Sequence, residues 1–125
     1  MKTFYRVEHA VDKYLKTYYL GLYQSSVACK HMNDWSVHIM PYHDEGFKVD
    51  VEGILSLAQG CYIFAFPDVD RLKKWVYKRE WLEELSRLGY VLSVYECDDG
   101  YHGDTQSIFN WEKAQLKHRI NLLEV

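Results

Sequence analysis

The chain has 125 residues, a formal net charge of −3 and three cysteines. This length suits a single domain that buries a core without disulfides, and the odd number of cysteines with no CxxC pair argues against a disulfide framework. The weakly acidic balance provides no global positive field, so we do not expect nucleic acid as a partner. No apolar run has the length of a membrane span and no signal-peptide core is present, so we expect a cytoplasmic protein without a membrane partner.

The N-terminal segment predicts a first strand over residues 2–8, because apolar and polar residues alternate loosely there. Arg6 lies inside this strand, and an arginine in a short strand is usually an outward-facing, solvated residue. Residues 9–23 fit either a helix or a strand that is interrupted by Gly21.

Residues 24–53 show no sustained periodicity, and we expect irregular structure there with short elements at most. The segment gathers nitrogen, sulfur and oxygen donors: Cys29, His31, His38, His43 and Asp44. Their spacing matches no zinc module, and histidines in such segments are more often solvated or hydrogen-bonded locally. We therefore expect no metal site.

In the second half of the chain, one strand is predicted before a helix and one after it. Residues 61–66 are aromatic and β-branched, and Pro67 ends the run because it has no N–H for a sheet ladder. Residues 90–97 form the second such run. A short helix is expected over residues 51–57.

The segment 68–88 between these strands predicts one long helix. Asp68 is a suitable N-cap, and Gly89 is a suitable stop after the last turn. Apolar residues recur at three- and four-residue steps and form one stripe: Val69, Leu72, Trp75, Val76, Leu82, Leu85 and Leu88. The basic residues of its first half, balanced by acids in the second, indicate a solvated face.

The C-terminal quarter predicts a loop, a strand and a helix. Residues 98–104 are dense in turn formers, residues 105–110 form a last strand, and residues 111–122 have partial helical spacing. The fold class that follows is α+β. We expect one domain over residues 1–125, with a small, mostly antiparallel sheet against which the 68–88 helix packs.

No GxGxxG, GxxxxGK[ST] or GxSxG motif occurs, so dinucleotide-binding, P-loop and α/β-hydrolase classes lack support. Four short segments carry a different likeness: residues 5–7, 62–66 ahead of a helix, 90–95 and 106–109. Their order resembles a group of short phage and prophage proteins, and more remotely the small ADP-ribosyltransferase fold. The phage likeness covers most of the chain outside residues 24–53.

The remote resemblance implies an NAD site. Arg6 would match the first-strand arginine that holds NAD, and a guanidinium suits bidentate phosphate contact. Tyr62 or Phe64 would line the nicotinamide pocket, and Gln106 would stand at the position of the catalytic glutamate. A neutral amide there keeps a hydrogen bond but loses the charge, which commonly costs on the order of 100-fold in rate.

Two functional hypotheses follow. The first is a small phage or prophage interaction protein that needs no cofactor and that binds and inhibits a host or defence protein in the host cytoplasm. The resemblance, the small size and the surplus of aromatic residues (eleven Tyr, five Phe and four Trp) favour it. The alternative is an ADP-ribosyltransferase-like enzyme that uses NAD to modify a host target.

Overall fold

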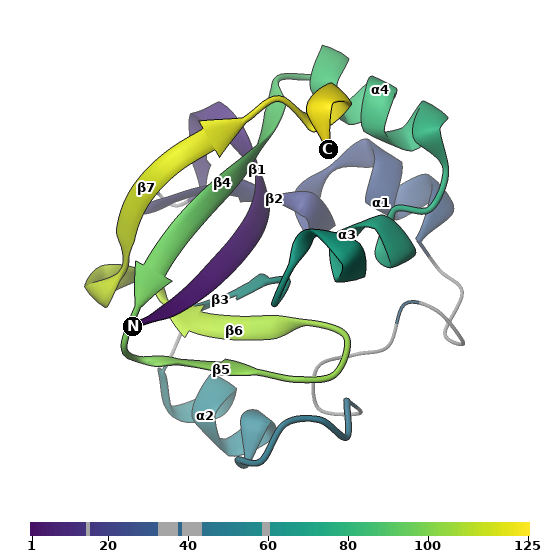
Figure 1. The fold of residues 1–125 in the computed structure, drawn as a ribbon. Helices are drawn as coiled ribbons and strands as arrows, with labels where there is room; N and C mark the ends of the chain where they lie inside the picture. The colour runs from purple at the N-terminus through teal and green to yellow at the C-terminus, as the bar shows by residue number, and fades with distance from the viewer. Residues whose placement is uncertain (15, 33–37, 39–43, 59–60) are drawn as a thin grey trace.

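The computed structural model describes residues 1–14, 16–32, 38, 44–58 and 61–125, and it has the predicted α+β class. Within these residues the strands form two antiparallel sheets, with the orders β2-β1-β4-β7 and β3-β6-β5 (Figure 1). The strands are β1 (Lys2–Tyr14), β2 (Tyr18–Gly21), β3 (Tyr62–Ala65), β4 (Tyr90–Cys97), β5 (Gly100–His102), β6 (Ser107–Asn110) and β7 (Gln115–Ile120). The helices are α1 (Ser26–His31), α2 (Val51–Ala58), α3 (Val69–Trp75) and α4 (Arg79–Arg87), with 3-10 turns η1 (Leu22–Gln24), η3 (Trp111–Lys113) and η4 (Leu122–Glu124).

A backbone bridge joins the two sheets. Tyr5 on β1 and Phe66 after β3 exchange two backbone hydrogen bonds, with N···O distances of 3.0 and 2.7 Å. Figure 1 shows the smaller sheet below the larger one in this view, with α1, α3 and α4 gathered on one side of the molecule. The first strand therefore takes part in the larger sheet and also anchors the smaller one.

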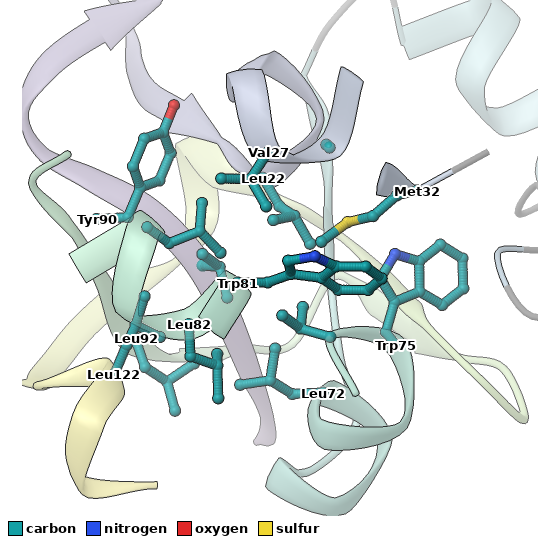
Figure 2. Packing of buried hydrophobic residues seen from close by; sticks show 14 of the residues in the cluster. Leu22, Val27, Met32, Leu72, Trp75, Trp81, Leu82, Tyr90, Leu92 and Leu122 are labelled. Carbon is teal, nitrogen blue, oxygen red and sulfur yellow. The ribbon is translucent and has the colours of Figure 1, made fainter. Parts of the chain in front are cut away.

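Two apolar cores hold these layers together. The larger core lies between the helices and one face of the larger sheet, and Figure 2 shows Trp75 at one end of it and Leu92 and Leu122 at the other. The smaller core lies between the sheets, where the rings of Phe4 and Phe109 stack with centroids 4.9 Å apart. Burial of such side chains stabilises the fold by roughly 1.5–3 kcal/mol each.

Several predicted elements are confirmed. Strands β3 and β4 and helix α2 lie where the sequence places them, and β6 occupies most of the expected last strand. Asp68 caps α3 by accepting a hydrogen bond from the Arg71 N–H at 2.8 Å. Gly89 has a φ of +96°, a left-handed conformation that L side chains rarely adopt, and it ends the helical region as predicted.

The long helix predicted over residues 68–88 is wrong in one respect, because the structure has two helices there. Helix α3 ends at Trp75, and α4 begins at Arg79 after a short non-helical link. Tyr77 in this link packs edge-on against Trp81, with ring centroids 4.8 Å apart. The break lets both helices turn their apolar faces to the same core.

The ends of the chain also differ from the predictions. The first strand continues to Tyr14 and pairs with β2, so the helical alternative for residues 9–23 is wrong. The terminal helix predicted over 111–122 is wrong too, because residues Gln115–Ile120 form β7 along β4. Pairing with β4 and packing of Ile120 outweigh a weak helical pattern. The expected 98–104 loop contains the short strand β5.

The Asp44 carboxylate fixes the loop before β6. One of its oxygens accepts the backbone N–H groups of Gly46 and Asp104 at 3.1 and 2.9 Å, and the other accepts those of Thr105 and Gln106 at 2.9 and 3.1 Å. Asp44 is buried, and its bond to the Gln106 N–H is buried as well, whereas the other three bonds are partly buried. A single side chain thus accepts hydrogen bonds from four backbone donors of this loop and of the turn after Asp44.

Replacing this carboxylate tests its structural role. We expect Asp44→Ala to lower the free energy of unfolding by about 1–3 kcal/mol, because it removes the acceptor of four backbone hydrogen bonds, of which the one from Gln106 is buried. Urea denaturation followed by circular dichroism measures the change. Glu45→Ala, an exposed acidic neighbour, is the matched control and is expected to have almost no effect. Equal stability of both variants would contradict this role.

Candidate functional site

A small pocket lies between the segment of β2 and η1 on one side and β3 on the other, with β1 at its base. Its volume is about 80 Å³. The structure brings to this pocket all four residues that the remote resemblance singles out: Arg6, Tyr62, Phe64 and Gln106. Their roles toward NAD stay predictions, but their common location makes this pocket the candidate functional site.

Arg6 is buried, with 4% of its surface exposed, so the expectation of a solvated arginine is wrong. Its Nε donates to Glu8 Oε1 at 3.1 Å, and its Nη1 and Nη2 donate to the carbonyls of Phe64 at 2.7 Å and Tyr19 at 3.0 Å. Gly21 makes room for the guanidinium, because a Cβ atom there would lie 2.5 Å from Nη2. Arg6 therefore links β1, β2 and β3.

Glu8 is the centre of a buried polar network on the same face of β1. It has no exposed surface, and its Oε2 accepts from Ser93 Oγ and Tyr95 Oη, each at 2.7 Å. Arg119 on β7 adds a contact of 3.4 Å. Burial lowers the pKa of Arg6 while Glu8 opposes that shift, and burial together with Glu8 raises the pKa of Tyr95.

Sequence reasoning missed Glu8, Ser93, Tyr95 and Arg119. One signal was available, because residues 6 and 8 of a strand point to the same face and carry opposite charges. The partners on β4 and β7 could not be found without the strand register, which places Ser93 beside both Arg6 and Arg119. The two arginines and one carboxylate leave this network with a formal charge of +1.

Three other side chains shape the pocket walls. Gln106 is 1% exposed, and its Oε1 accepts from the Tyr23 hydroxyl at 2.8 Å. Burial of that hydroxyl raises its pKa above the ordinary tyrosine value. The Tyr62 hydroxyl is directed to Asp99, to which it donates at 2.5 Å. This leaves the pocket walls largely aromatic and neutral.

Asp99 lies behind Tyr62 and is held as a carboxylate. Burial raises its pKa, but hydrogen bonds from Tyr62 and Asn110 and the charge of Lys113 outweigh that effect, so its pKa lies below the ordinary value. The Tyr62 hydroxyl thus has a fixed acceptor, and its ring rather than its hydroxyl is what Tyr62 offers to the pocket.

A continuous series of aromatic rings, which we call the aromatic row, runs from the pocket across the molecule. Neighbouring ring centroids lie between 4.8 and 6.3 Å apart. In order, the row consists of Phe64, Tyr23, Trp75, His38, Tyr77, Trp81 and His31. Three of its members are exposed to solvent: Tyr77 with 51% and Tyr23 with 38% of their surface exposed, and His31 at the far end of the row.

The candidate metal donors are used in other ways where the structure describes them. His31 stacks on Trp81, His38 contacts the Trp75 carbonyl at 2.8 Å, and Asp44 holds the loop before β6. His43 lies outside the described residues. Among the residues that are described, no group of three or more His, Cys, Asp or Glu side chains could hold a metal ion.

Fold and site together define a small α+β protein with a buried Arg–Glu network under a small pocket and an aromatic row beside it. The family model of the Bacteriophage T4 Y00F protein matches residues 1–123, so the chain belongs to this phage protein family. The phage part of the resemblance is thereby confirmed. Neither a curated protein nor a solved structure shows significant similarity, and the likeness to ADP-ribosyltransferases gains no support from these comparisons.

In the described part of the chain, no helix has the length and apolar character needed to cross a membrane.

Neutralising Glu8 tests the importance of the buried network. We expect Glu8→Gln to lower the free energy of unfolding by about 3–5 kcal/mol, because it leaves Arg6 as a buried charge without its counter-ion. The matched control is Glu96→Gln, in which the partly exposed carboxylate loses an ion pair with Lys117 at 4.0 Å. This change is expected to cost less than about 1 kcal/mol. Similar urea midpoints for the two variants would show that the buried pair is not needed.

Proposed function

We propose that this phage protein binds a protein of the host cell or of its antiphage defence and inhibits it, acting in the host cytoplasm without a cofactor. The observation that carries the proposal is the aromatic row, which exposes Tyr77 and Tyr23 along a rigid series of packed rings. Tyrosine and tryptophan are enriched at protein interfaces because they bring large contact areas with few rotatable bonds. Membership of a phage family makes a host protein the natural partner.

The setting of Tyr77 supports this role. It lies in the link between α3 and α4, where its ring packs against His38 and Trp81. The Lys78 ammonium lies 5.4 Å from the Trp81 ring centroid, which adds a cation beside the aromatic surface. A preformed aromatic surface loses little conformational entropy on binding, so much of its contact energy is retained in the complex.

The experiment is affinity capture from host lysate with the tagged protein, followed by an activity assay of the captured protein. We expect Tyr77→Ala to weaken capture at least tenfold, which corresponds to about 1.4 kcal/mol of binding free energy. Tyr14→Ala is the matched control, because Tyr14 is also exposed (38%) but is not part of the aromatic row. The proposal would be refuted if both variants lost the same amount of captured protein. It would also be refuted if the captured protein kept its activity unchanged.

The second candidate function is NAD-dependent ADP-ribosyl transfer. The observation that favours it is that Arg6, Tyr62, Phe64 and Gln106 line one pocket. The dimensions oppose it, because sites for drug-sized ligands commonly measure about 300–1,000 Å³ and this pocket has about 80 Å³. Arg6 also already donates to Glu8 and to two backbone carbonyls, so only part of its donor capacity is open to a pyrophosphate.

Calorimetry with NAD separates the two functions. We expect no binding heat at millimolar NAD and no transfer of label from NAD to proteins of the host lysate. Saturable binding that Gln106→Leu abolishes, together with label transfer, would instead establish the enzymatic function. Tyr14→Ala again provides a folded control whose mutation lies outside the pocket.

A further inference from the structure

The pocket beside Arg6 has the size of one small functional group. Its volume of about 80 Å³ is close to half that of an apolar cavity of roughly 150 Å³ that holds one benzene molecule. It can therefore take about three or four non-hydrogen atoms, which is the size of a carboxylate with one methylene group. A nucleotide or a second aromatic ring is too large.

The charge around the pocket favours an anion. Arg6 is the only charged side chain among the described residues that line it, and no lining residue is acidic. Glu8 neutralises the charge of one arginine behind the pocket. Arg119 contacts the same carboxylate, so the group of three side chains keeps one excess positive charge. Because the surroundings are buried, the remaining positive charge acts through a lower effective dielectric than in water.

Arg6 also has donor capacity left. A guanidinium carries five N–H groups, of which three are used toward Glu8, Phe64 and Tyr19. Each terminal nitrogen retains a second N–H that finds no acceptor within hydrogen-bond distance among the described residues. A buried charged group with open donors has a strong preference for an acceptor, and an ionised acceptor forms the stronger bond.

We propose that the pocket binds the carboxylate of an acidic side chain on the partner protein. This inference rests on the proposed function and specifies the anchor that the partner inserts. Tyr23 connects the pocket to the aromatic row, because its ring packs on Phe64 at 5.5 Å and on Trp75 at 6.2 Å. One acidic side chain enters beside Arg6, and the neighbouring surface of the partner lies along the row. A buried anchor surrounded by aromatic contacts is the usual arrangement of an interface hot spot.

Peptide titration of the isotope-labelled protein, followed by NMR, tests the pocket without a host partner. The probes are the capped tripeptides Gly-Asp-Gly and Gly-Asn-Gly, which differ only in the charge of the central side chain. We expect saturable shifts of the Arg6 Nε–H and Gln106 side-chain signals with the aspartate peptide. The asparagine peptide is expected to bind at least tenfold more weakly.

Variants assign the binding to Arg6. Arg6→Gln combined with Glu8→Gln removes both members of the buried pair together, which avoids an isolated buried charge and is expected to abolish binding in a folded protein. Gly21→Ala provides an independent change, because the added Cβ would lie 2.5 Å from Nη2 and displace the guanidinium. Tyr14→Ala is the control and is expected to bind the peptide normally.

Four outcomes would overturn the proposal: no saturable shift, equal binding of the two peptides, normal binding by the double variant, or binding of free acetate without binding of the peptide. Tighter binding of inorganic phosphate than of the aspartate peptide would also overturn it. These results are independent of host capture. If the protein binds the peptide but captures no host protein, only the proposed function is contradicted. If it captures a host protein but does not bind the peptide, only the proposed carboxylate site is contradicted.

Discussion

The arrangement of this protein depends on one buried arginine. Arg6 bonds to a carboxylate on its own strand and to carbonyl oxygens of β2 and β3, so a single planar group spans strands of both sheets. A lysine could not replace it, because an ammonium lacks the fixed, planar donor geometry. Without Glu8 the guanidinium would be an uncompensated charge in the interior, so the loss of either partner destabilises the site of the other.

The sequence predicts the elements with strong local signals. Strands β3 and β4, the cap at Asp68 and the stop at Gly89 all follow from residue type and spacing. The sequence also contains a sign of the break between α3 and α4, because the spacing of the apolar stripe is interrupted between Val76 and Leu82. Strand β7 had no comparable signal, since its exposed, charged residues acquire their conformation from pairing with β4.

The candidate site shows the same division between local and distant information. Arg6 and Gln106 were found through a resemblance, and the structure places both at one pocket, although they are one hundred residues apart in the chain. The network behind them depends on which strands are neighbours, and no property of Ser93 or Arg119 alone reveals this. Its place in a short strand also suggested a solvated Arg6, whereas the structure buries this residue in the interior.

The place of β1 in the larger sheet has a consequence for synthesis. Its partner β4 ends at Cys97, and the outer strand β7 ends at Ile120, so the first strand must wait for most of the chain before its main pairing can form. Only the β1–β2 hairpin is available early. Pairings between such distant segments close slowly. The larger sheet therefore cannot close until residues 90–97 are available, and until then the N-terminal strand has an unpaired edge that is prone to aggregation.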